Sequence, residues 1–201
     1  MEKNTIASAC CMGEQILFSI DCETTGLNHR IHELIQICIL PFKNFKPLKE
    51  DAFYFQVKAL HPETAEQEAF ETHNLDPTEG LDRKQSIDLF YQWLKRIKAK
   101  FNIDKITPLG QDYAFDKEFI INWLDDFDLY HENFSSRYSD TKRNAVNIQR
   151  FYSPDFKTSL AEQAEYFGIK NDKHHDAYND SLVAIKILEK QVTTFEMSTV
   201  P

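Results

Sequence analysis

The chain has 201 residues, of which 42% are hydrophobic and 27% charged, values typical of one globular domain with a substantial core. No apolar run approaches the ~20 residues that a membrane-spanning helix needs, and the N-terminal stretch does not read as a signal peptide. The formal net charge of −9 argues against a broad basic face that grips nucleic acid. Two bound divalent cations would reduce this charge to −5, so the composition still allows a metal-dependent enzyme that acts on nucleic acid.

We expect a single domain over residues 1–201, with its core over about 15–192 and short flexible termini. The cysteines have no zinc-binding spacing, and two of them are adjacent, so we expect free thiols in a reducing, cytoplasmic location. They are Cys10, Cys11, Cys22 and Cys38.

The first strands are predicted near the N-terminus. Residues 15–23 contain the apolar run QILFSI, which suits a buried strand, and Gly26 and Asn28 mark a turn after it. Residues 31–40 combine alternation with a continuous apolar stretch and predict a second strand. Because the connection is short, the two strands are expected to pair as an antiparallel hairpin.

The middle of the chain predicts one more strand and two helices. A strand is expected over 51–59, a short helix within 61–75, and a longer helix over 86–101, where apolar residues recur at helical spacing. The basic run Lys95–Lys100 is expected to form a solvated face of the longer helix.

The second half of the chain alternates between short strands and helices. Gly168 is expected to end one helix and Asp176 to cap the next. The whole order, with strands first and then alternating elements, indicates an α/β sheet flanked by helices. Strands are predicted over 105–110 and 135–141, and helices over 114–127, 141–152, 159–168 and 175–192.

Two carboxylates stand at the end of the first predicted strand. Asp21 and Glu23 are two residues apart, so on a strand they share a face at a separation of roughly 6.5–7 Å. Carboxylates placed in this way can share hard divalent cations such as Mg²⁺ or Mn²⁺. Alone, the pair is more typical of an ordinary polar strand end than of a metal site.

The last predicted helix carries an acid on its apolar stripe. Asp180 lies between Ala177 and Ala184 on that stripe, so it needs a partner. His175 fits best just before the first turn, from which it could lean over whatever Asp180 binds, although the adjacent His174 competes for this place. A surface histidine and a boundary aspartate would explain this segment alone.

A third acid follows the fourth predicted strand. Asp116 falls in the first turn of the helix after Gly110, where acids are also common because they favour the helix dipole. The phenylalanine beside it, Phe115, has the helical spacing of a core residue rather than that of a platform for stacking bases.

Taken together, the stretches DCETTGL, GQDYAFD and HHDAYND resemble the three motifs of the DEDDh, or DnaQ-like, exonuclease family. These motifs are D-x-E, a G-H/N-N-x-x-F-D-like stretch and H-x-A-x-x-D, and the resemblance spans roughly residues 15–190, nearest to the proofreading type. The matching positions are Asp21, Glu23, Asp116, His175 and Asp180.

One departure from the family pattern lies in the second motif. Gln111 and Asp112 stand where the family often has His-Asn or Asn-Asn. Asp112 adds a carboxylate near the site, so contacts to the substrate backbone or the metal preference could differ from those of the family.

The resemblance implies a ribonuclease H-like fold, with a mixed central sheet of about five strands flanked by helices and the second strand antiparallel to the others. It also implies hydrolysis of nucleotides from a 3′ end with two Mg²⁺ or Mn²⁺ ions. Asp21 would bridge the ions, Glu23 and Asp180 would complete the first, and Asp116 would act at the second. His175 would be the general base, since a histidine can accept a proton near neutral pH.

By the same resemblance, the pocket for the terminal nucleotide would be lined by Thr24, Thr25, Gly26 and Leu27. The expected partners are single-stranded or frayed 3′ ends, with DNA favoured over RNA, and a polymerase or replication subunit on a separate chain. Two alternatives remain open: an exoribonuclease that trims oligonucleotides, and an inactive scaffold that binds nucleic acid.

Overall fold

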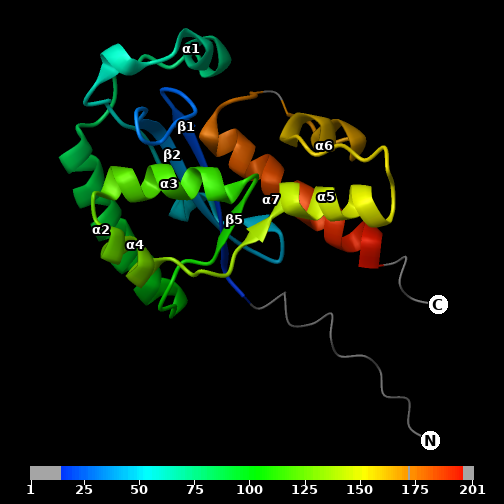
Figure 1. Cartoon of the computed structure of the whole chain (residues 1–201). Coiled ribbons are helices and arrows are strands. Elements are labelled where there is room, and N and C mark those ends of the chain that lie inside the picture. Colours follow the sequence, from blue (N-terminus) through cyan, green and yellow to red (C-terminus); the bar gives the residue numbers. More distant parts are fainter. Residues whose placement is uncertain (1–14, 172, 197–201) are drawn as a thin grey trace, which may run out of the picture.

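Six strands and seven α-helices form the described part of the chain, residues 15–171 and 173–196, in this computed structural model (Figure 1). The strands are β1 (Leu17–Thr24), β2 (Leu34–Lys43), β3 (Lys46–Pro47), β4 (Phe53–Gln56), β5 (Pro108–Gly110) and β6 (Ser139–Asp140). The α-helices are α1 (Gln67–His73), α2 (Arg83–Phe101), α3 (Tyr113–Leu124), α4 (Phe127–Asn133), α5 (Thr141–Phe151), α6 (Leu160–Tyr166) and α7 (Ala177–Glu196). Two 3₁₀ turns, η1 (Lys49–Asp51) and η2 (Pro62–Thr64), precede α1.

The strands form one mixed sheet in the order β3-β2-β1-β5-β6, and β4 also pairs with β2. The strand β2 runs antiparallel to β1, β3 and β4, while β5 and β6 run parallel to β1. The predicted mixed sheet, including its antiparallel second strand, is therefore confirmed. The added two-residue strand β3 raises the number of strands above the five expected.

The helices cover both faces of this sheet. The larger core lies between the sheet and α2, α3 and α4, where aromatic rings such as Phe53, Phe90 and Trp123 pack together. The other face is covered by α7, whose predicted apolar stripe, including Ala184 and Leu188, packs on β1 and β2. The helices α5 and α6 lie outside α7 in turn (Figure 1).

Both predicted signals at the ends of the last two helices are observed. Gly168 has φ +64° after α6, and the amide of Ile169 donates to Ala164 O at 2.7 Å, which closes the helix end. Asp176 caps α7, because its Oδ1 accepts the amide hydrogen of Asn179 at 2.9 Å.

Several predicted boundaries were wrong, for local reasons. The strand β2 begins at Leu34 rather than at residue 31, because Ile31 lies in a turn closed by Asn28 O. The helix predicted over 114–127 ends at Leu124, because Asp125 adopts the left-handed conformation, and Phe127 begins the separate helix α4. The strand expected over 51–59 is only Phe53–Gln56, and residues 61–75 hold η2 and then α1.

The basic run Lys95–Lys100 does more than form a solvated face. Arg96 and Lys100 reach from α2 to the buried carboxylate of Asp51, at 2.7 and 2.5 Å. Burial raises the pKa of Asp51, but the hydrogen bonds from Lys100 and Arg96 outweigh this effect and hold the pKa below its ordinary value. These residues therefore tie α2 to η1 at the edge of the sheet.

The prediction of free thiols holds for Cys22 and Cys38, which are buried and form no disulfide, whereas Cys10 and Cys11 lie outside the described residues. Of the termini predicted to be flexible, residues 1–14 and 197–201 also lie outside them, while residues 193–196 continue α7. Over residues 15–171 and 173–196, no helix is long and apolar enough to cross a membrane.

Candidate active site

Asp21 and Glu23 lie on the face of β1 that α7 covers. On the α7 face of the sheet, Leu17 packs in the core with that helix, and Ser19 Oγ donates to Ser181 O at 2.9 Å. Since alternate residues share a face, Asp21 and Glu23 continue the same row toward the end of the strand. Both acids therefore share one face of β1, as the D-x-E spacing predicted, and this face is the one that α7 covers.

Asp116 reaches the same place from the other side of β1. The neighbouring strand β5 ends at Gly110 and pairs only with the first part of β1, so β1 extends past it. Beyond that point, the amide of Cys22 donates instead to Asp116 Oδ1 at 3.0 Å. The carboxylate thus satisfies an unpaired strand amide and is held beside the acids of β1.

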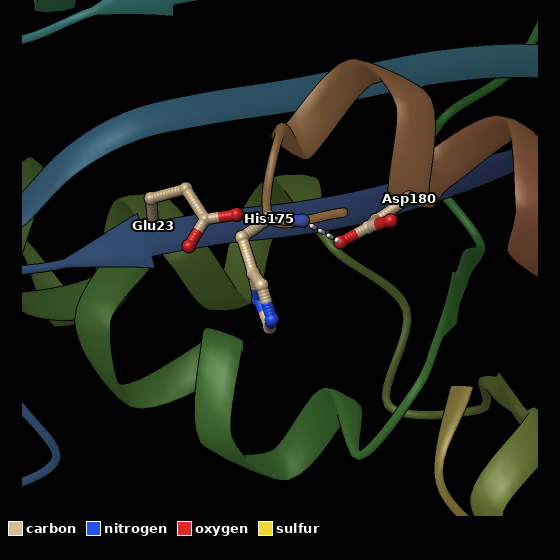
Figure 2. A group of neighbouring side chains, drawn as sticks. All are labelled: Glu23, His175 and Asp180. Atoms are coloured by element: carbon tan, nitrogen blue, oxygen red, sulfur yellow. Dashed lines mark hydrogen bonds between the residues drawn. The ribbon is translucent and has the colours of Figure 1, made fainter. Parts of the chain in front are cut away.

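The start of α7 positions His175 and Asp180 together (Figure 2). His175 adopts the left-handed conformation, with φ +59°, and its backbone amide donates to Asp180 Oδ2 at 3.0 Å. This turn leaves the His175 side chain exposed, between the strand that carries Glu23 and the first turn of α7. His174 does not line the cleft that His175 lines; its Nδ1 lies 3.1 Å from Asn171 Nδ2.

One open cleft of about 550 Å³ collects these groups. Within the described chain, Glu23, His175 and Asp180 form the cluster whose ligand atoms all lie within 4.8 Å of one another. Asp21 and Asp116 line the same cleft but are not members of this tight cluster. All five residues that match the motifs are therefore brought together, although they come from β1, α3 and the start of α7.

Burial raises the pKa values of these four acids, and the charges of neighbouring carboxylates raise those of Asp21, Glu23 and Asp116 further. Burial raises the pKa of Asp21 well above its ordinary value, and the charges of Asp116 and Glu23 raise it further. Burial also raises the pKa of Glu23 to about 8, with a contribution from Asp180. The pKa values of Asp116 and Asp180 are raised by burial as well, although backbone amides oppose the shift. Cations in this cleft would relieve the cost of ionising the cluster.

We expect the metal-free protein to lose thermal stability as the pH rises from about 4.5 to about 8, the ordinary and folded pKa values of Glu23. Below this interval the carboxyl is protonated in the folded and unfolded chains alike, whereas within it the unfolded chain ionises more readily. Calorimetry in chelator should show this fall, and added Mg²⁺ should raise the melting temperature most at the upper end. A melting temperature that rises with pH in chelator would contradict the raised pKa of Glu23.

Comparison with known proteins identifies the family of the chain. The sequence model of the RNase_T exonuclease family matches residues 18–188, which is most of the chain. The chain belongs to this exonuclease family. The resemblance to DEDDh exonucleases is thereby confirmed, and members of this family use divalent metal ions.

Solved exonucleases have the same fold at low sequence identity. The cell-death related nuclease CRN-4 has a TM-score of 0.69 at 16% identity, over 89% of this chain and 64% of its own. Exonuclease I of E. coli, in complex with a dT13 oligonucleotide, has a TM-score of 0.67 at 18% identity, over 91% of this chain and 43% of its own. The nuclease domain of 3′hExo, a DEDDh family member bound to rAMP, has a TM-score of 0.66 at 16% identity, over 89% and 92%.

These similarities establish the ribonuclease H-like exonuclease fold. The chain spans less than two thirds of the length of CRN-4 and less than half that of exonuclease I. No curated protein sequence matches this chain. The substrate must therefore be argued from the site itself.

A second cleft, of about 270 Å³, adjoins the acidic one on the side of α1. The two clefts share Glu23, Leu27 and His175, and Thr24 and Gly26 line the second. Leu27 is 77% exposed, so its apolar side chain projects into solvent at the junction.

Two predicted residues of this region have different surroundings from those expected. Thr25 lines neither cleft, because it is buried and its Oγ1 accepts the amide hydrogen of Glu33 at 2.9 Å. Phe115 packs against Phe119 and the core, but it also lines both clefts, so the prediction of a core residue holds for one side of the ring only.

Gly26 is required by close packing in this turn. A Cβ atom at Gly26 would lie 2.4 Å from Nδ1 of His32, whose ring is buried against the turn. The ring in turn meets Glu66 through Nε2 at 3.2 Å. Glycine thus lets the turn after β1 pack against the His32 side chain, which lies just before β2.

Sequence reasoning missed His73, which ends α1 and borders the second cleft. Its Nδ1 accepts the amide hydrogen of Leu75 at 3.0 Å, so its Nε2 donates to Thr24 O at 3.1 Å. Burial lowers the pKa of His73, which favours this neutral form. The imidazole therefore holds the chain directly after Glu23, where the pairing of β1 with β2 becomes irregular. The histidine beside the helix-ending Asn74 was the only sequence signal for this role.

Proposed function

We propose that this protein is a 3′-to-5′ exonuclease that hydrolyses the phosphodiester bond at the 3′ end of single-stranded or frayed DNA and releases nucleoside monophosphates. The observation that carries the proposal is the convergence of four acids and an exposed histidine on one open cleft. The cleft is open enough for a strand end to enter, with an apolar-edged pocket beside it for the last base.

The donor set fits hard divalent cations. Four carboxylates with raised pKa values offer oxygen ligands, which suit Mg²⁺ or Mn²⁺. When bound, two such ions would stabilise the charge that develops on the attacking and leaving oxygens of an in-line displacement. Asp21 would bridge them, Glu23 and Asp180 would hold the first, and Asp116 would hold the second.

The remaining requirement is a base. His175 projects its exposed ring into the acidic cleft, and its backbone is fixed by the amide that donates to Asp180. The ring would take one proton from the attacking water, whose oxygen forms the new bond to phosphorus while the bond to the 3′ oxygen of the next nucleotide breaks. That released oxygen then takes up a proton, so the exchange balances.

The terminal nucleotide would occupy the second cleft. Thr24, Gly26 and Leu27 would contact it directly, with Leu27 wedged against a base, whereas Thr25 would hold the turn from behind. The half-buried ring of Phe115 adds a second apolar wall that both clefts share. Stacking on such walls accepts any base, as a nuclease without sequence preference requires.

A degradation assay on matched oligonucleotides tests the proposal. Single-stranded DNA labelled at its 5′ end should shorten stepwise in Mg²⁺ or Mn²⁺ and stay intact in chelator. Matched RNA and mismatched duplex DNA provide the other arms, because the fold is shared by exonucleases bound to dT13 and to rAMP. Faster loss of RNA would favour the exoribonuclease alternative, and no loss of any strand would favour an inactive scaffold. Co-purification on a replicative polymerase would test a partner on a separate chain.

A further inference from the structure

An ion pair crosses the rim of the acidic cleft, at the position where the second motif departs from the family pattern. Lys142 Nζ lies 2.6 Å from Asp112 Oδ2, and both side chains line the cleft while remaining about half exposed, at 45% and 49%. Gln111 also differs from the family pattern, but both polar atoms of its side chain have partners within the protein: Nε2 donates to Thr158 O, and Oε1 accepts from Gln163 Nε2. Asp112 is therefore the departure that can affect the substrate.

The buried Asp140 holds this pair in place. Its Oδ1 accepts the amide hydrogen of Arg143 at 2.9 Å and caps α5, while its Oδ2 accepts that of Tyr113 at 2.9 Å at the start of α3. One side chain thus joins the beginnings of both helices. As a result, Lys142, in the first turn of α5, meets Asp112, the residue that precedes α3.

The charges around the pair are otherwise acidic. Among the described residues that line this cleft, Lys142 is the sole lysine or arginine. Asp112 precedes Asp116 by four residues, which is about one turn of α3. The ion pair that Asp112 forms with Lys142 therefore lies about one helical turn from a carboxylate of the second motif. A strand whose end reaches the acids must carry its next phosphates past this rim.

We propose that Lys142 binds a non-scissile phosphate of the nucleic-acid strand, and that Asp112 competes with that phosphate for the ammonium group. This inference rests on the proposed exonuclease function and assigns a phosphate subsite to the same cleft. A lysine suits this task, since its ammonium group binds phosphate as a point charge without fixing the sequence.

The salt dependence of binding tests the lysine. Binding of a 5′-labelled single-stranded oligonucleotide in chelator can be measured by fluorescence anisotropy. The Lys142→Met protein should bind it more weakly than the unmodified protein, by up to about fivefold. The slope of log affinity against log salt should become shallower by about 0.7, the value for one lost phosphate contact on a single strand. An unchanged slope would overturn the proposal.

The carboxylate is tested by Asp112→Asn, which keeps the size of the side chain and tolerates the left-handed backbone at φ +71°. This variant should bind the strand several-fold more tightly, up to about fivefold, and have a lower KM, because Lys142 is released. In a Lys142→Met background, the same change should have a much smaller effect. An equal effect in both backgrounds would mean that Asp112 merely repels the strand and would refute the competition.

The control for lost charge is Lys95→Met, since Lys95 is exposed on α2 and does not line the cleft. It should leave the salt slope unchanged. Because the readout is binding in chelator, it separates the two proposals. A protein that binds strands through Lys142 but degrades none would refute the exonuclease function and leave the phosphate subsite standing.

Discussion

Replacing Asp21 with Asn is expected to lower the kcat for hydrolysis of the phosphodiester bond at a 3′ end on the order of 10³-fold. Asp21 lies at the end of β1 between the acids of α3 and α7, and its pKa is raised by burial and by the charges of Asp116 and Glu23. A residue in this central position would bridge two cations, and an amide cannot supply the same negative charge. Single-turnover degradation of a labelled strand in Mg²⁺ measures the loss.

The same substitution should make the metal-free protein more stable. At neutral pH the Asp21 carboxyl ionises freely in the unfolded chain, whereas burial and like charges raise its pKa in the folded chain, so its neutral isostere removes a cost of folding. The gain in melting temperature should shrink as the pH falls toward 3.8, its ordinary pKa, because the carboxyl is then protonated in the unfolded chain as well as in the folded one. Asp128→Asn, on the exposed surface of α4, is the control and should change neither property. A destabilised Asp21→Asn protein would show that misfolding, not lost chemistry, explains the inactivity.

The sequence predicted which residues meet at the site better than it predicted the element boundaries and long-range contacts around it. Asp21 and Glu23 could be placed on one face because a strand has a strict two-residue period, and Asp180 because the apolar stripe of the last helix has helical spacing. Their convergence followed only from the resemblance of three motifs to a family. No local rule predicts that β5 would end early and leave the amide of Cys22 for Asp116.

Features governed by contacts distant in sequence were not predictable. The family resemblance placed Thr25 in the pocket, but its hydroxyl oxygen accepts the amide hydrogen of Glu33, eight residues later. The basic run on α2 looked solvated because its partner, Asp51, lies 45 residues before Arg96. The choice between His174 and His175 likewise depended on one left-handed backbone position, which helical periodicity cannot reveal.

Replacing His175 with Asn is expected to lower kcat by about 10²- to 10⁴-fold, the range for loss of a general base. Asparagine is the informative choice because His175 has φ +59°, a conformation that alanine adopts only at a cost. The backbone amide that donates to Asp180 should therefore remain in place, and the variant should lose only the imidazole. Steady-state degradation of single-stranded DNA in saturating Mg²⁺ measures the effect.

Metal binding decides how this loss is interpreted. The ring of His175 lies close to the carboxylates of Glu23 and Asp180, so it could in principle act as a ligand rather than as a base. Titration calorimetry with Mn²⁺ should give nearly the same affinity for the variant as for the unmodified protein, because carboxylates supply the ligands in the proposed function. A parallel loss of affinity would make His175 a ligand, and near-normal turnover would remove it from the chemistry altogether. The adjacent His174→Asn is the matched control, since that ring turns toward Asn171, and its turnover should be unchanged.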